Sequence, residues 1–514
     1  TVNAMAQRCP PKEVLALAFG AMIGWGWVVL IGGWIESAGS IGAMLAFLIG
    51  GTAVVLIGLT YAELASAMPL TGGEHVYSHR ALGMGGSFFC TWAIILGYVS
   101  VVAFEAVALP TVIEQLFPNY KMGYLWTVAG WDVYFTWALV GVGGAILMTW
   151  VNIRGIQASA VMQKVVTLLI MVVGIMLLTG SLFNGEAGNM EPLFKDGMGG
   201  VMAVLIMTPF MFVGFDVIPQ AAEEIDLPFK QIGRILLLSV FMAVAWYIFM
   251  ILGVSLLMTP AQTATSNLAT ADAMTLAFGG SWAGKLLVLA GIGGILTSWN
   301  AFLVGGSRAV YAMAQSKMLP GFLAKMHPVY NTPVNAILLI GALSIIAPLF
   351  GRKSLVWLVD AGGLGIVIAY AMVALSFLVL RKKEPDMPRP FKVSRGNLVG
   401  YGALIFAIGI TCLYLPGSPA ALIWPYEWAI VLAWSLLGFV FYLRSRKSNM
   451  QLTHVGKHAF NYAFILQRMP VSKAIGFYDL ATPPTLCNRF ELILWYFLVL
   501  AIVDQQTTVV ALTE

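Results

Sequence analysis

Charge is scarce in this chain. Of its 514 residues, only 10% are Asp, Glu, Lys or Arg, whereas a soluble globular protein carries about 25%. Hydrophobic residues make up 60% of the sequence, and the mean hydropathy is +0.87. This composition excludes an ordinary soluble domain and predicts a protein that crosses a membrane many times.

Cysteine and histidine are also scarce. The four cysteines, Cys9, Cys90, Cys412 and Cys487, are scattered, and no pair has the spacing of metal ligands. Neither a disulfide framework nor a zinc site is therefore indicated. None of the five histidines lies at the centre of an apolar run, which argues against a histidine proton relay.

Catalytic and nucleotide-binding motifs are absent in any plausible context. The sequence contains no phosphate-binding loop, metalloprotease signature or nucleophile elbow. We therefore expect no cofactor and no bound metal, and we predict that the protein is neither an ATP-driven pump nor a membrane enzyme.

Long apolar runs are abundant, and they do not alternate as barrel strands do. Each reaches about 20 residues, the length of an α-helix that crosses a bilayer. Between charged or Pro/Gly-rich breaks, twelve transmembrane helices are predicted, at residues 13–36, 41–68, 84–112, 131–151, 161–183, 199–221, 235–258, 285–313, 333–350, 355–380, 398–416 and 425–443.

Basic residues concentrate in every second connecting loop. If the N-terminus is cytoplasmic, the inside loops hold Arg8, Lys12, Arg80, Arg154, Lys230, Arg234, Lys317, Lys325 and the stretches "RKKEPDMPRPFKVSR" and "RSRK". The outside loops hold only Lys121, Lys195, Lys285, Arg352 and Lys353. This bias predicts an integral plasma (inner) membrane protein with both termini in the cytoplasm.

The net charge of +5 is thus explained by topology. We expect the lipid bilayer, and no nucleic acid, as a partner. The N-terminal "TVNAMAQRCPPKE" lacks the features of a signal peptide, so the first span is expected to be retained.

Glycine is concentrated in the middle of two spans. The first span carries Gly20, Gly24 and Gly26, and the sixth carries Gly214 between two prolines in "TPFMFVGFDVIP". Helices broken at corresponding positions of two halves indicate a transporter's binding site near the membrane midplane. The alternative is that these small residues only allow close helix packing.

Six stretches, taken in order, resemble the amino acid–polyamine–organocation (APC) transporters over about residues 10 to 447. They are "FGAMIGWGWV", "YAELASAMPLTGGEHVYSHRALG", "NIRGIQASAVMQKV", "FVGFDVIPQAAEEIDLPFKQIGR", "NAFLVGGSRAVYAMAQSKMLP" and "FLVLRKKEPDMPRPFKV". The resemblance implies an all-α polytopic membrane protein with 12 transmembrane helices, arranged as a 5+5 inverted repeat (the leucine-transporter-like fold) plus two C-terminal helices.

The domain boundaries expected from this resemblance follow the spans. The first five-helix repeat would cover residues 13–183, the second inverted repeat 199–380, and helices 11 and 12 residues 398–443. A tail of unknown role would follow at 448–514, where the apolar run "LILWYFLVLAIV" is too short for a comfortable span.

The resemblance also implies a substrate site at the two breaks. Ile23, Gly24, Trp25 and Gly26 in helix 1, and the region from Phe212 to Phe215 in helix 6, would line it. Backbone amides there could hold a carboxylate, and carbonyls could hold an ammonium group. This chain departs from the family pattern, which has a small residue in place of Trp25 and usually Ile in place of Trp27. A bulky indole argues against the standard pose of an α-amino acid.

Two acids lie inside predicted spans. Glu105 is in helix 3, and Asp216 directly follows the helix 6 break. A carboxyl group in the hydrocarbon zone must pair, face water or take up a proton, so a functional role is the default hypothesis, with a structural role as the alternative. Indole rings and carboxylates together favour an ammonium group, which makes an amine substrate a competitor to an amino acid.

Tyr98, Trp27, Phe212, Gly214 and Phe215 complete the candidate substrate-binding set. Tyr98 precedes Glu105 on the same span and could point into the same cavity, although a buried tyrosine often only packs. The aromatic residues near the helix 6 break are candidate gates, with core packing as the alternative. Asp216 and Glu105 are the candidate coupling or gating residues.

The coupling ion is less clearly indicated. Some proton-coupled members of the family carry a lysine in helix 5 at the position that is Ile170 here. Thr297 and Ser298 supply hydroxyls where sodium-coupled relatives of the fold have them, so they are weak sodium candidates. Proton coupling through Glu105 or Asp216, or simple exchange, is favoured.

The leading hypothesis is a secondary active transporter that moves amino acids or related amines by alternating access. A different class of protein is the alternative: a non-transporting membrane sensor or subunit that retains the fold. The sequence leaves the identity of the substrate, the direction of transport and the oligomeric state open.

Overall fold

The structure, a computed structural model, describes residues 11–117, 119–222 and 228–450. The chain divides into two compact units, Thr1–Ser445 and Arg446–Glu514. All the sites discussed below belong to the first unit. Beyond residue 450, the tail expected at 448–514 lies outside the described residues.

The described chain is almost entirely helical. In order, its elements are α1 (Pro11–Met22), α2 (Gly26–Val29), α3 (Ile31–Ala38), α4 (Ser40–Ala67), α5 (Glu74–Leu116), β1 (Tyr124–Val128), β2 (Trp131–Tyr134), α6 (Phe135–Ile153), α7 (Ile156–Asn184), η2 (Ala187–Met190), α8 (Gly197–Leu205), α9 (Thr208–Phe212), α10 (Val217–Gln220), α11 (Phe229–Leu257), α12 (Pro260–Thr265), α13 (Ala269–Phe278), α14 (Ser281–Gln315), η4 (Gly321–Ala324), α15 (Val334–Ile346), η5 (Ala347–Phe350), α16 (Ser354–Lys383), α17 (Gly396–Leu413) and α18 (Tyr426–Met450).

The helices have the length and composition of membrane spans. Within the described ranges, ten are long and apolar enough to cross a bilayer, and the pair Glu13–Val29 and Ile31–Ala38, bent by 65°, provides an eleventh. The predicted span at 333–350 is helical but shorter, as Val334–Phe350. The chain is therefore an all-α polytopic membrane protein, and the number of spans predicted, twelve, stays a prediction.

Two of the spans are interrupted where the glycines predicted a break. Helix 1 loses regular geometry at Ile23, Gly24 and Trp25, between α1 and α2. Helix 6 is interrupted after α9, where Val213 is extended and Gly214 has a φ of +139°. Glycine adopts such a positive φ without steric cost. At Gly214 the break packs against α1, because a Cβ there would lie 2.8 Å from the Ala21 Cβ.

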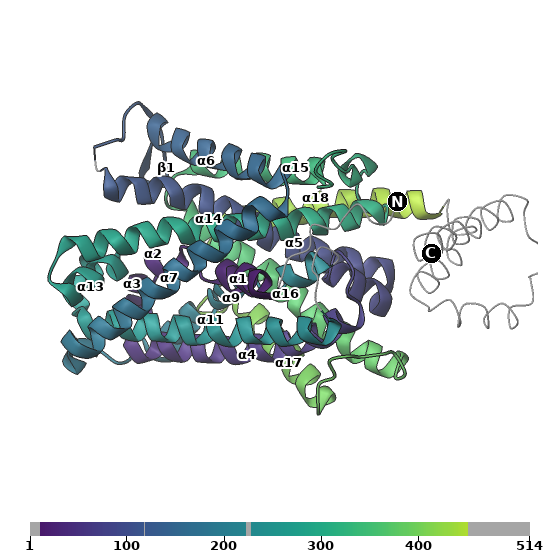
Figure 1. The fold of residues 1–514 in the computed structure, drawn as a ribbon, viewed down its shortest axis with the longest axis horizontal. Coiled ribbons are helices and arrows are strands. Elements are labelled where there is room, and N and C mark those ends of the chain that lie inside the picture. The colour runs from purple at the N-terminus through teal and green to yellow at the C-terminus, as the bar shows by residue number, and fades with distance from the viewer. Residues whose placement is uncertain (1–10, 118, 223–227, 451–514) are drawn as a thin grey trace, which may run out of the picture. The chain divides into compact units, whose positions relative to one another are not determined.

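The broken helices lie inside the bundle of the first unit. Figure 1 shows α1 and α9 near the middle of the helices, with α14 on one side and α4 and α11 on the other. The long helices pack as extended pairs, chiefly α5 with α16, α4 with α11 and α14 with α5. The interrupted backbone is thereby surrounded by protein, as it must be at membrane depth.

One predicted boundary is wrong. The span expected from residue 131 begins only at Phe135, because Trp131–Tyr134 pairs antiparallel with Tyr124–Val128. Ala129 and Gly130 both have positive φ, at 49° and 76°, as tight hairpin turns require. The span predicted from residue 84 begins directly after a kink in α5, because Gly83 has a φ of 75° and separates the polar first turns, which start at Glu74, from the apolar part of the helix.

Candidate functional site

A small cavity lies where the break in helix 1 meets α5, α9, α11 and α14. All of the side chains around it are buried, so the cavity is inside the protein. Its lining consists of Ala21, Met22, Gly24, Trp25, Gly26, Val101, Phe104, Glu105, Phe210, Met211, Tyr247, Ser298 and Phe302.

The cavity brings together part of the predicted substrate-binding set. Gly24, Trp25, Gly26 and Glu105 line it, and Ser298, a sodium candidate, lies beside them. Sequence reasoning missed the aromatic walls from other helices, such as Tyr247. No local motif marks a wall residue, because its orientation depends on how α11 packs against helix 1.

Glu105 enters the cavity from α5 and is 2% exposed. The backbone N–H of Trp25 and the hydroxyl of Ser298 approach its carboxyl group as hydrogen-bond donors. Its Oε2 is buried and has no hydrogen-bond partner among the described residues. No lysine or arginine of the described chain forms an ion pair with it. This carboxyl group is therefore only partly compensated by the protein.

Gly24 allows this arrangement. A Cβ at that position would lie 2.9 Å from the Glu105 Oε1 and 2.8 Å from the Ser298 Cβ, both closer than real Cβ contacts. Any side chain at Gly24 would consequently push the carboxyl group or α14 away from the break. The glycine is explained by close approach to Glu105 and Ser298.

The indole ring of Trp25 packs against α14. A Cβ at Gly291 would lie 2.0 Å from the Trp25 Cζ3, so the indole ring fills a notch that only glycine leaves open. Its Nε1 is buried without a hydrogen-bond partner in the described chain. Trp27 points elsewhere: its ring packs edge-on against Trp246 at 5.2 Å, and it is not part of the cavity lining.

Tyr98 does not line the cavity with Glu105. Its hydroxyl donates to Asp216 Oδ2 at 2.6 Å, and the N–H of Gly214 donates to Asp216 Oδ1 at 2.8 Å. Phe215 lies between Tyr61 and Tyr370, with ring centroids 5.3 and 5.5 Å away. Asp216, Tyr98 and Phe215 thus form a second cluster, on the side of the helix 6 break where α4 ends and α5 begins.

The remaining candidates lie near the breaks but outside the cavity lining. Ile23 and Phe212 are fully buried, and the Phe212 ring packs against Phe47 at 5.6 Å and Tyr247 at 5.5 Å. A role for these residues in substrate binding stays a prediction.

The two sodium candidates face different groups. The Thr297 hydroxyl lies 3.2 Å from the Gly20 carbonyl oxygen and 3.1 Å from that of Gly294, whereas Ser298 faces Glu105. Ile170 is fully buried in α7. In the described ranges there is no group of three or more His, Cys, Asp or Glu that could hold a metal ion. Sodium binding at the hydroxyls stays a prediction.

Known proteins resemble this chain along most of its length. The sequence model of the family described as "Amino acid permease" matches residues 11–443. The chain belongs to the amino acid permease family. Within the APC transporters, this permease is similar to the branched-chain amino acid permease BcaP of Bacillus subtilis, at 27% identity over 448 residues, covering 85% of this chain and 92% of the relative.

Other relatives carry different names. The methylthioribose transporter of Bacillus subtilis is 25% identical over 454 residues, covering 87% of this chain and 95% of its own length. Mouse cationic amino acid transporter 4 is 28% identical over 399 residues, covering 74% of this chain and 61% of the relative. The predicted family and the prediction of a secondary transporter are confirmed. The sensor alternative receives no support, and the family and these relatives carry the names of permeases and transporters.

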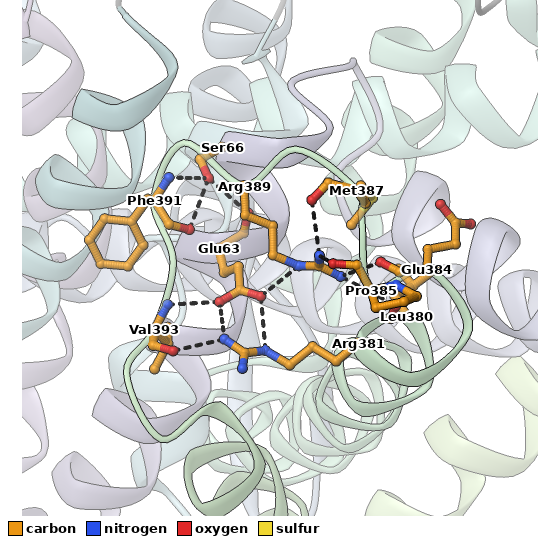
Figure 2. A network of polar contacts seen from close by, with 10 residues as sticks. All are labelled: Glu63, Ser66, Leu380, Arg381, Glu384, Pro385, Met387, Arg389, Phe391 and Val393. Carbon is orange, nitrogen blue, oxygen red and sulfur yellow. Dashed lines mark hydrogen bonds and ion pairs between the residues drawn. The ribbon is translucent and has the colours of Figure 1, made fainter.

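A further polar network in this permease was not predicted. Figure 2 shows Glu63, near the end of α4, surrounded by the last turn of α16 and the chain that follows it. Arg381 donates to both Glu63 oxygens, with Nε 3.0 Å from Oε1, and Arg389 Nε lies 3.0 Å from the same oxygen. The Val393 N–H donates to Oε2 at 2.8 Å. The partners are more than 300 positions apart, so no local motif could reveal them.

Proposed function

We propose that this permease moves amino acids or related amines by secondary active transport with alternating access, and that the substrate binds in the cavity beside Gly24 and Glu105. The observation that carries this proposal is the Glu105 carboxyl group, which faces interrupted backbone and keeps one oxygen without a partner among the described residues. Broken helices that meet a buried charge are the usual construction of a transporter's midplane site.

The contacts of Glu105 favour an amine over a standard α-amino acid. An N–H at the helix 1 break is the group that would hold a substrate carboxylate, and here the Trp25 N–H faces Glu105 instead. A substrate carboxylate would meet a like charge at that place. An ammonium group would find the unpartnered carboxyl oxygen and the aromatic walls of the cavity.

The finer topology belongs to the same proposal. The charge bias of the loops supports cytoplasmic termini and a plasma membrane location. Breaks in the first helix of each half support two inverted five-helix repeats at 13–183 and 199–380, with two further helices at 398–443. A proton, or exchange of one substrate for another, would supply the coupling.

The test is uptake into proteoliposomes with matched substrate pairs. Lysine and cadaverine differ only in the carboxylate, as do leucine and isopentylamine. We expect each amine to compete for uptake at least about tenfold better than its amino acid, which corresponds to about 1.4 kcal/mol. Equal competition within both pairs would contradict the proposal that Glu105 favours an amine over an amino acid. If none of the four compounds competes, the transport proposal itself is contradicted.

The coupling ion is tested in the same vesicles. Uptake of labelled cadaverine is measured with sodium replaced by potassium and with an acidic or an alkaline exterior. We expect uptake to follow pH and to be indifferent to sodium. Uptake that requires sodium would instead favour the Thr297 and Ser298 hydroxyls as ligands.

A further inference from the structure

Two fully buried carboxyl groups share one hydroxyl below the helix 6 break. Glu74 begins α5, and Asp216 precedes α10; both are 0% exposed. The Tyr98 hydroxyl lies 2.6 Å from Asp216 Oδ2 and 3.5 Å from Glu74 Oε1. Glu74, Tyr98 and Asp216 are called the carboxyl pair cluster below.

The groups that face this cluster are donors and weak acids. The Tyr61 hydroxyl of α4 lies 3.0 Å from Glu74 Oε1, and the Gln220 amide of α10 donates to Oε2. Further titratable neighbours are Tyr77 and Cys90 from α5 and Tyr370 from α16. Arg308, a buried basic residue of α14, donates to the Ser307 hydroxyl. No lysine or arginine of the described chain forms an ion pair with either carboxyl group.

Counting hydrogens shows what this arrangement requires. The Tyr98 hydroxyl has one hydrogen, but its oxygen contacts both Asp216 and Glu74. Both contacts can be hydrogen bonds only if one of the two carboxyl groups supplies a second hydrogen. Two ionised carboxylates enclosed without a cation would also carry a large uncompensated cost. The buried arrangement is therefore built for a pair that holds a proton.

A second observation is independent of the acids. Gln220 Oε1 is buried and has no hydrogen-bond partner in the described chain, and neither have the hydroxyls of Tyr77 and Tyr370. The Gln220 amide already contacts Glu74 through its nitrogen. If the amide turns over, Oε1 accepts a hydrogen from a protonated Glu74. Among the described residues, the cluster thus contains an unused acceptor beside Glu74, which forms no ion pair with a lysine or arginine there.

From these contacts we propose that Glu74, Tyr98 and Asp216 form a proton-binding site, separate from the substrate cavity. While the side of the transporter where α4 ends is closed, the site holds one proton received from the opposite side, and it releases that proton when the side where α4 ends opens. The inference rests on the proposed transport function. The site is linked to the cavity through Gly214: it donates to Asp216 and packs on Ala21 and Met22, which line the cavity. Separation of α1 from the helix 6 break would admit water and let the proton leave as one carboxyl ionises.

The transport test compares Glu74→Gln with the wild type in proteoliposomes, using labelled lysine and cadaverine as probes. Glutamine mimics a permanently protonated Glu74. We expect wild-type accumulation of a probe to follow an imposed pH gradient, and accumulation by Glu74→Gln to fall at least about tenfold while exchange of probe for probe persists and no longer varies with pH. Glu36→Gln, an exposed acid on α3, is the matched control and should behave as the wild type. Gradient-driven accumulation by Glu74→Gln at the wild-type level would overturn the proposal.

A spectroscopic test does not depend on transport. Infrared difference spectra of the purified full chain between acidic and alkaline pH report protonated carboxyl groups directly. We expect a carboxyl band that Glu105→Gln leaves in place and that Glu74→Gln or Asp216→Asn removes, with Tyr98→Phe, the mildest change, shifting it. If Glu74→Gln, Asp216→Asn and Tyr98→Phe all leave the carboxyl band unchanged, the proposed proton site is wrong. If the wild type shows the band but moves neither probe, the transport function fails and the proton site stands.

Discussion

Glu63 and Glu105 are both buried glutamates on consecutive long helices, 0% and 2% exposed, but their carboxyl groups have very different partners. Glu63 receives two arginines and a backbone N–H, so its charge is fully compensated within the protein (Figure 2). Glu105 receives an N–H and a hydroxyl, and one of its oxygens has no partner in the described chain. A buried charge that the protein compensates holds elements together, whereas one left partly uncompensated is available to a ligand.

The largest effect on uptake is expected from a substitution of Glu105, the glutamate that is available to a ligand. Glu105→Gln should reduce cadaverine uptake by at least about a hundredfold, equivalent to about 2.7 kcal/mol, because the ammonium group loses its counter-charge. Its thermal unfolding in detergent should be unchanged or slightly improved, since an incompletely paired carboxyl group is removed. Uptake and melting are measured on the same preparation. Unchanged uptake kinetics would retire Glu105 as the ammonium ligand.

The reciprocal change tests the other half of the comparison. Glu63→Gln should destabilise the protein by about 3–5 kcal/mol, because Arg381 and Arg389 lose their shared carboxylate in a buried setting. Thermal unfolding in detergent measures this loss. The double variant Glu63→Gln with Arg389→Gln should recover part of the stability. A melting temperature equal to that of the wild type would show that the network does not hold α4 and the chain after α16 together.

A smaller effect is expected from the backbone beside Glu105. Gly24→Ala should lower cadaverine uptake about tenfold, because the added Cβ would lie within 2.9 Å of the Glu105 and Ser298 side chains. Gly33→Ala is a matched control in the same region of the chain, where an added Cβ meets nothing within 4 Å. Similar losses in both variants would indicate a general intolerance of helix 1 to substitution instead of a close approach to Glu105.

The broad architecture could be predicted because the bilayer imposes simple rules. Every predicted apolar segment overlaps a helix or an interrupted helix of the described chain. The breaks followed from Gly24 and Gly214, since irregular backbone at membrane depth needs flexible residues and a protein environment. Glu105 could be proposed as a site residue because an unpaired acid inside an apolar span is energetically costly on any face of the helix.

Orientation and long-range pairing could not be predicted. Tyr98 was assigned to the cavity because it shares a helix with Glu105, but helical side chains lean toward the N-terminus of their helix. Its hydroxyl therefore reaches toward Glu74, where α5 begins, and toward Asp216. Glu74 lies in a stretch that the sequence marks only by its resemblance to the family, because its burial depends on the bend of α5 and on the contact with Gln220 of α10.

The smallest effect is expected at an ion pair that differs from the Glu63 network mainly in the exposure of its side chains. Arg80 and Glu384 form an ion pair with the same chemistry as Arg381 and Glu63, with Nη2 2.6 Å from Oε2, but their side chains are 38% and 31% exposed. Water and salt screen such a pair, so Arg80→Gln should change the free energy of unfolding by less than about 1 kcal/mol, and less still at high salt. Thermal unfolding at low and high salt measures both values beside those of Glu63→Gln. A loss as large as that of Glu63→Gln would mean that burial does not explain why the two pairs differ, and that the chain after α16 depends on both attachments equally.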